Sequence, residues 1–300
     1  GITGPKSNFT NSILISNDAG TGTLDAASNN TGLGFEVFDD LTTADDNVAV
    51  GSQAMHKVTT GGSNVAIGQL ALGTNTTGVD NIAIGKEALT ALTTSGNNIA
   101  IGKDALKANT IGNTNVAIGT DAMTTNVAAD RNVAVGEQAL QNMTAATSTD
   151  TYNIGVGYNA GLSITSGLRN TAVGGLALDA LTTENDNVAV GYNALGAEVS
   201  GFRNVAVGSS AGSTQNGGTN NTLVGYAAGN AITTADANTI IGSDAGDVLT
   251  TGADNVAVGQ NALGAATTSS NNTAVGHDAG AAITTGDRNV AIGSLAMDAN

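Results

Sequence analysis

Short apolar runs separated by polar turns recur along almost the whole chain. In each regular run a Val, Ile or Thr is followed usually by Ala, then by Val or Ile, and then by Gly. Alternation over three residues that stops at a glycine is typical of a short β-strand followed by a turn, and such a run is too short for a helix. The pattern therefore predicts many short strands and no helix of consequence.

An asparagine precedes each run and sets the period of the repeat. It recurs every 17 residues from Asn47 to Asn289, except for one step of 21 between Asn132 and Asn153, which indicates a loop insertion near 143–151. With two degenerate earlier copies, the chain holds about 17 copies. A unit this short fits one coil of a β-solenoid, whose coils stack at the strand spacing of about 4.8 Å.

The copies divide the chain into three parts: an N-terminal lead-in at 1–11, degenerate first coils at 12–46 and the regular array at 47–300. The last coil is incomplete at residue 300. Because an open coil exposes a sheet edge, we expect the array to be truncated there and to continue in a longer protein.

Repeat positions are counted from the asparagine, which is position zero. Side chains alternate across a strand, so positions one and three, which hold Val, Ile or Thr, are expected to line one buried face. Position two then points to the opposite face, and it is polar in none of the fifteen regular copies. We therefore predict that another copy of the chain covers position two. The residues predicted for this chain–chain contact are Ala49, Ala66, Ala83, Ala100, Ala117, Ala134, Ala172, Ala189, Ala206, Leu223, Ile240, Ala257, Ala274 and Ala291.

Position four is glycine in all fifteen regular copies, as expected if the chain turns there with a positive φ. Position seven is Ala in every copy, and position eight is Leu, Met or Gly. The stacked asparagines are expected to bond to backbone groups at the turns. The predicted structural turn glycines are Gly51, Gly68, Gly85, Gly102, Gly119, Gly136, Gly157, Gly174, Gly191, Gly208, Gly225, Gly242, Gly259, Gly276 and Gly293.

Composition narrows the function classes. Aromatic residues make up 3% of the chain and Trp is absent, which favours a thin core of small side chains. The absence of Cys excludes disulfides and thiolate metal sites. A net charge of −16 disfavours nucleic acid and anionic membranes as partners. No apolar run is long enough to span a bilayer, and no motif calls for a cofactor.

The segments Asn64-Val-Ala-Ile-Gly68 and Asn289-Val-Ala-Ile-Gly293 resemble the head repeats of trimeric autotransporter adhesins of the YadA-like kind. The longer unit starting at Asn272 is similar to repeats of bacteriophage tail fibres. The resemblance covers roughly 12–300 and implies a left-handed parallel β-roll, a homotrimer and an extracellular location on a virion or a bacterial surface. The unit here is longer than is usual in adhesin heads, so loop details are not carried over.

These observations predict a structural protein rather than an enzyme. The first hypothesis is a rigid trimeric shaft of a phage tail fibre that mediates host attachment, with a cell-surface receptor or polysaccharide bound at a tip or along the loops. The alternatives are a bacterial trimeric adhesin head and a monomeric ice- or ligand-binding solenoid. The third rests on Thr-Thr pairs, although these lie in loops beside Gly rather than on a strand face.

Two motifs point to chemistry but fit the repeat better. Gly208-Ser-Ser210-Ala-Gly212 matches the nucleophile elbow of hydrolases, yet its residues occupy positions four to eight of an ordinary coil. His56 and His277 occupy positions nine and five, so they do not stack into a ligand pair. Neither motif supports a catalytic or a metal site.

Two rows of side chains recur at shared positions. Position six is acidic in three successive coils, which indicates a solvated face eased by neighbouring lysines or, as the less favoured reading, an oxygen-ligand site for a cation such as Ca²⁺. Tyrosine holds position five in alternate coils, as a shield for the coil edge or as a contact stripe for a receptor or sugar. The two rows are Glu87, Asp104 and Asp121, and Tyr158, Tyr192 and Tyr226.

Overall fold

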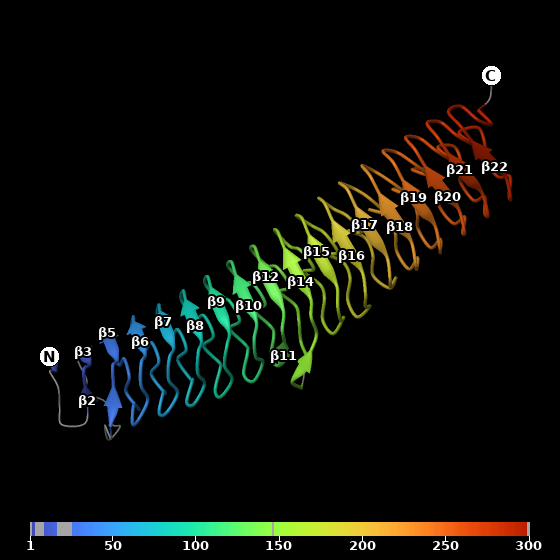
Figure 1. Cartoon of the computed structure of the whole chain (residues 1–300). Coiled ribbons are helices and arrows are strands. Elements are labelled where there is room, and N and C mark those ends of the chain that lie inside the picture. The colour runs from blue at the N-terminus through green and yellow to red at the C-terminus, as the bar shows by residue number, and fades with distance from the viewer. Residues whose placement is uncertain (1, 4–8, 17–25, 146, 299–300) are drawn as a thin grey trace. The chain divides into compact units, whose positions relative to one another are not determined.

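The computed structural model describes residues 2–3, 9–16, 26–145 and 147–298, and the chain divides into two compact units, Gly1–Tyr152 and Asn153–Asn300. The described residues form strands, turns and loops and include no helix, which confirms the predicted all-β solenoid with a parallel sheet (Figure 1). The unit boundary follows the insertion, where the sequence indicated only a loop.

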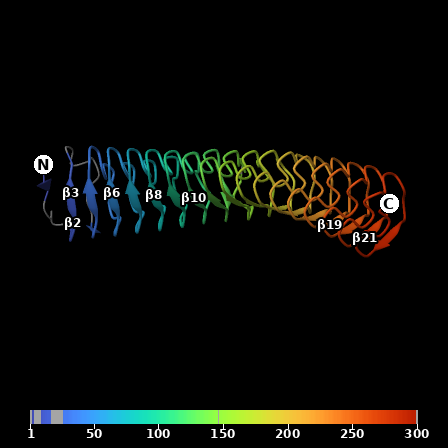
Figure 2. The ribbon, with the colours of Figure 1, turned by 90° about the horizontal axis from the view of Figure 1, so that it is seen from above.

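The first unit contains eight coils, each contributing one strand to a parallel ladder. The strands lie side by side along the stack (Figure 2). They pair position for position, so that Val48 pairs with Val65 and Ala49 with Ala66. The ladder strands are β3 (Ile13–Ile15), β5 (Thr31–Leu33), β6 (Val48–Val50), β7 (Val65–Ile67), β8 (Ile82–Ile84), β9 (Ile99–Ile101), β10 (Val116–Ile118) and β12 (Val133–Val135).

Five shorter strands flank this ladder. β1 (Ile2–Thr3) pairs antiparallel with β3, while β2 (Phe9–Thr10) pairs in parallel with β4 (Ala27–Ser28). β11 (Ala129–Asp130) pairs in parallel with β13 (Thr149–Asp150), which lies inside the predicted loop insertion. The insertion is thus partly built as a second short strand pair.

The second unit contains nine coils with the same sequential, parallel pairing and the same register. Its strands are β14 (Ile154–Val156), β15 (Thr171–Val173), β16 (Val188–Val190), β17 (Val205–Val207), β18 (Thr222–Val224), β19 (Thr239–Ile241), β20 (Val256–Val258), β21 (Thr273–Val275) and β22 (Val290–Ile292). With the eight of the first unit, they account for the predicted 17 copies.

The asparagines at position zero form a buried ladder, as predicted. The Asn64 backbone N–H donates to Asn47 Oδ1 at 3.0 Å, and Asn64 Nδ2 donates to the same oxygen at 3.2 Å and to the Gly78 carbonyl at 2.8 Å. The next asparagine repeats these bonds with Asn64 as acceptor. Each asparagine side chain therefore forms hydrogen bonds with buried backbone groups of two coils. Because the core contains few large apolar side chains, these bonds help to fix a single stacking register.

The glycines at position four adopt the predicted turn, with φ between 122° and 141° in all fifteen regular copies. A second constraint acts on the same atoms. A Cβ on Gly102 would lie 2.4 Å from the Gly119 carbonyl oxygen of the next coil, and the position-four glycines from Gly51 to Gly119 and from Gly157 to Gly276 meet the same obstacle, whereas Gly293 in the last coil has nothing within 4 Å. Glycine is required both by the backbone conformation and by the close approach of successive coils.

The coil interior is narrow and is filled mainly from positions two and eight. Most coils combine Ala at position two with Leu or Met at position eight, both fully buried. Where position two is Leu223, position eight is Gly229, and a Cβ there would lie 2.8 Å from Leu223 Cδ2. The reverse exchange pairs Gly32 with Phe38, whose Cδ2 would lie 2.9 Å from an added Cβ. In these coils the two positions share one space and compensate each other in size. Other coils, such as those with Ala206 and Gly212 or with Ala274 and Gly280, have a small residue at both positions.

Position eleven completes the interior, although the sequence analysis did not identify it. In some coils it is a buried apolar residue such as Leu92 or Ile232. In others it is a buried polar residue that caps the following loop: Asn75 Oδ1 accepts from the Gly78 N–H at 2.9 Å, and Asn75 Nδ2 donates to the Gly78 carbonyl at 3.1 Å. Amides, one carboxylate (Glu198) and aliphatic side chains thus occupy the same buried column.

Candidate functional site

Positions one and three of each ladder strand point away from the coil interior. In β7, Ala66 at position two is fully buried, Val65 is half-buried and Ile67 is 40% exposed. The other ladder strands repeat this order of burial. The prediction that positions one and three line the buried face is therefore wrong, because the narrow interior accepts the small residue and leaves the large ones outside.

The predicted chain–chain contact at position two is therefore also wrong. The fourteen residues from Ala49 to Ala291 assigned to that contact are at most 2% exposed within a single chain. A side chain without exposed surface has nothing to offer a second chain. Any contact between copies through the strands has to use positions one and three, which we call the strand face.

The strand face is apolar without interruption in the middle of the first unit. From β6 to β12 both positions are Val or Ile in all six coils, a length of about 24 Å at the usual strand spacing. In the second unit, position one is instead Thr in four of nine coils. Soluble monomers rarely leave contiguous apolar surface of this kind uncovered. The strand face of the first unit is thus the first candidate for a contact surface.

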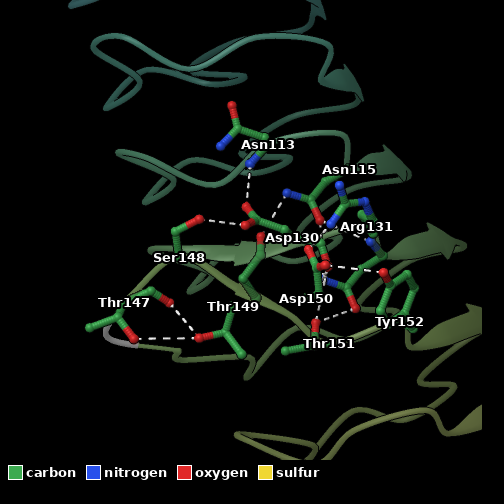
Figure 3. Close-up of polar contacts among 12 residues, drawn as sticks. Asn113, Asn115, Asp130, Arg131, Thr147, Ser148, Thr149, Asp150, Thr151 and Tyr152 are labelled. Atoms are coloured by element: carbon green, nitrogen blue, oxygen red, sulfur yellow. Dashed lines mark hydrogen bonds and ion pairs between the residues drawn. The ribbon is translucent and has the colours of Figure 1, made fainter.

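A polar cluster holds the insertion against the preceding coils (Figure 3). Asp130 in β11 is buried; its Oδ1 accepts from the Asn113 N–H at 2.6 Å, and its Oδ2 accepts from Ser148 Oγ at 2.5 Å. Thr151 Oγ1 donates to Asn132 Oδ1 at 2.7 Å, taking the place that the next asparagine has elsewhere in the ladder. These polar groups form their hydrogen bonds within the chain, which indicates that the cluster has a structural role.

An exposed pair borders this cluster. Arg131 forms an ion pair with Asp150, and its guanidinium carbon lies 5.9 Å from the centre of the Tyr152 ring. The Tyr152 hydroxyl donates to Asp150 Oδ2 at 3.0 Å (Figure 3). The Tyr152 ring, the Arg131 guanidinium and the Asp150 carboxylate thus contact one another.

The acidic row at position six is bridged by lysines. Lys107 Nζ lies 2.5 Å from Glu87 Oε2 and 3.1 Å from Asp104 Oδ1, and Lys103 Nζ lies 3.0 Å from Asp104 Oδ2. Hydrogen bonding to Lys107 lowers the pKa of Glu87. Burial opposes ionisation of Asp104, but its bonds to Lys103 and Lys107 outweigh that effect and lower its pKa. Ammonium groups stand where a calcium ion would need to bind, so the row is a solvated ion-pair network.

The two histidines and the hydrolase-like motif lie in turns of the regular coils. His56 Nδ1 lies 3.9 Å from Asp39 Oδ2, and His277 Nδ1 lies 2.9 Å from Asp278 Oδ2, so each has its own carboxylate neighbour. No group of three or more acidic or histidine side chains suited to a metal occurs among the described residues. Gly208–Gly212 follows β17 as an ordinary turn, whereas a nucleophile elbow leads from a strand into a helix.

Threonines of the Thr-Thr loops are engaged in the stack. Thr59 Oγ1 donates to the Thr76 carbonyl at 3.1 Å, and Thr76 Oγ1 donates to the Thr93 carbonyl at 3.1 Å. In the second unit Thr250 Oγ1 donates likewise to Thr267 at 2.9 Å. The first hydroxyl of most such pairs bonds to the next coil in this way, so these hydroxyls are not free to form an exposed array.

The three tyrosines at position five stand out from the surface. Tyr158, Tyr192 and Tyr226 are 54%, 59% and 62% exposed. Side chains this exposed cover little of the coil edge, so the exposures favour the contact-stripe reading over the shield.

No protein-family model matches the chain, and no similar protein is found among curated ones. In the part of the chain that the structure describes, no helix is long and apolar enough to cross a membrane. The solenoid exposes two surfaces that its own stacking does not explain, the strand face and the tyrosines at position five.

Proposed function

We propose that the chain is a structural segment of a host-attachment fibre, as in the shaft of a phage tail fibre, and that three copies pack together through their strand faces. The observation that carries the proposal is the uninterrupted Val/Ile strand face of the first unit. Apolar surface of this kind is stabilised by burial at about 25 cal/mol per Å², so covering it favours association. A repeated face on a regular stack suits a rotationally symmetric assembly, in which each copy offers the same surface.

The architecture supports the mechanical part of this role. Each coil bonds to its neighbours through backbone ladders, buried asparagines and loop threonines, so stiffness is built in along the stack. Solenoids of this kind gain stability from nearest-neighbour contacts and can lengthen by adding coils. Acidic net charge keeps such assemblies soluble and apart from one another.

Light scattering after size exclusion tests the proposal. A mass of about three times 29.2 kDa is expected for the chain. The variant I67K/I118K places two charges on the strand face and should run as a folded monomer, whereas the control I67V/I118V should remain a trimer. A wild-type chain that stays monomeric at high concentration would contradict the proposal and favour a monomeric ligand-binding solenoid.

A further inference from the structure

Position five of the second unit forms a row of distinctive chemistry. It contains no Asp, Glu, Lys or Arg, although the chain carries a net charge of −16. Three tyrosines alternate with small residues along its first part. The row, which we call the tyrosine row, consists of Tyr158, Gly175, Tyr192, Ser209, Tyr226, Ser243, Gln260, His277 and Ser294.

The backbone holds the tyrosines at a regular spacing. The Leu176 N–H donates to the Tyr158 carbonyl at 3.0 Å, and the Ser210 N–H donates to the Tyr192 carbonyl at 2.9 Å. Tyr226 is held in the same way at 2.9 Å by the next coil. Successive rings therefore start two coils apart, at about 10 Å. The strands β14, β16 and β18 belong to one parallel ladder (Figure 1), and each ends two residues before its tyrosine, so all three tyrosines follow the same ends of the strands.

The small residues between the tyrosines leave room for the rings. A Cβ on Gly175 would lie 3.6 Å from Tyr192 Cδ2, so this ring leans over the preceding coil, where a larger side chain would stand. Among the described residues, no hydrogen-bond partner is found for the hydroxyls of Tyr158, Tyr192 and Tyr226. Tyr152 differs, because its hydroxyl bonds to Asp150 and its ring faces Arg131.

We propose that the tyrosine row binds an uncharged, linear polysaccharide that lies along the stacking direction of the coils. Sugar rings present an apolar face of C–H groups that packs on aromatic rings, and their hydroxyls pair with phenol, serine and glutamine groups. A two-coil step is close to the length of a disaccharide, so alternate sugars meet successive tyrosines. The absence of charge in the row and the acidic chain select a neutral polymer over an anionic one. This inference rests on the proposed role in attachment and names the ligand class.

Affinity electrophoresis of the full chain in gels containing hydroxyethyl cellulose, soluble mannan, xyloglucan or dextran tests the inference. At least one neutral polysaccharide should retard the wild-type chain and quench its emission, which comes from tyrosine alone because Trp is absent. The variant Y158S/Y192S/Y226S uses the residue that neighbouring coils carry at the same position, and it should lose retardation. Tyr192→Ser alone should weaken binding roughly two- to tenfold, the size of one aromatic contact. The control Tyr152→Ser should bind like wild type.

The double variant Y192S/S209Y tests the spacing. It keeps three tyrosines in the row but shifts one by a single coil, so it should bind as weakly as Tyr192→Ser. Full binding by this variant would refute the two-coil match. Absence of retardation in every gel, or unchanged retardation of the triple variant, would overturn the inference whatever the oligomeric mass. A change of light-scattering mass in the triple variant would instead assign the row to contact between copies and would also overturn it, whereas the proposed fibre fails only if the wild-type chain is monomeric.

Discussion

Two neighbouring glycines allow a sharp test of why the repeat keeps glycine at position four. Gly174 occupies that position with φ 134°, and a Cβ on it would lie 2.4 Å from the Gly191 carbonyl oxygen. Gly175 follows directly but lacks a positive φ, and its Cβ would meet nothing closer than 3.6 Å. We predict that Gly174→Ala strongly destabilises the chain, whereas Gly175→Ala leaves its stability equal or slightly higher.

The magnitudes follow from separate costs. Holding a residue other than glycine in a sparsely populated backbone region costs about 1–3 kcal/mol. Relieving the overlap with the next coil adds about 1–3 kcal/mol, as in other overpacked sites, because the Gly174 N–H also donates to the Val156 carbonyl at 2.8 Å and resists displacement. The expected loss at Gly174 is thus about 2–6 kcal/mol. Gly175→Ala should instead gain up to about 1 kcal/mol, since alanine restricts the unfolded chain.

Urea unfolding followed by far-UV circular dichroism measures both variants against wild type under one condition. The unfolding midpoint should fall for Gly174→Ala and hold or rise for Gly175→Ala. Equal losses in the two variants would refute the reasoning, because they would show that neither the φ value nor the glycine carbonyl of the next coil sets the requirement.

Two further predictions concern packing and charge. Leu223→Ala should lower the free energy of unfolding by about 2–5 kcal/mol, because it opens a cavity. The double variant L223A/G229L restores the usual Ala and Leu pair, so its free energy of unfolding should lie within about 1.5 kcal/mol of wild type. Strict additivity in the double-mutant cycle would contradict the shared space. Lys107→Gln should lose up to about 1 kcal/mol at pH 7. Because the pKa values of Glu87 and Asp104 are lowered in the folded state, this loss should shrink as pH falls below about 4. A loss in urea midpoint that persists at pH 2 would contradict the ion-pair account.

The period of the repeat was enough to predict the fold. A strand followed by glycine every 17 residues leaves few architectures other than a stacked coil, and the parallel register of Val48 on Val65 follows directly from it. The buried asparagine ladder was predictable for the same reason, since one amide at one position in every coil finds the same neighbours. The spacing indicated an insertion near 143–151, but the pairing of β13 with β11 was not predictable, because it occurs once and leaves no periodic signal in the sequence.

The direction of each strand face was not predictable from alternation alone. Both sides of the strand are free of charge, so period two separates two sets of side chains without saying which set is inside. Assigning the larger, β-branched residues to the interior gives the wrong face, because Ala66 is inside and Ile67 outside. The decisive signal was present in the sequence as the size exchange between positions two and eight, where Leu223 accompanies Gly229. Residues that compensate each other in volume have to share the interior.

That exchange also indicates where function resides. Interior columns are constrained from coil to coil, because each coil packs directly on the next. Outward columns are free of this constraint, and they differ between the units: the strand face is uniformly Val or Ile in the middle of the first unit, while the second carries Thr at position one and tyrosines at position five. Differences that the stacking does not require need another cause. We propose contact with a second copy as the cause for the first surface and contact with a polysaccharide for the second.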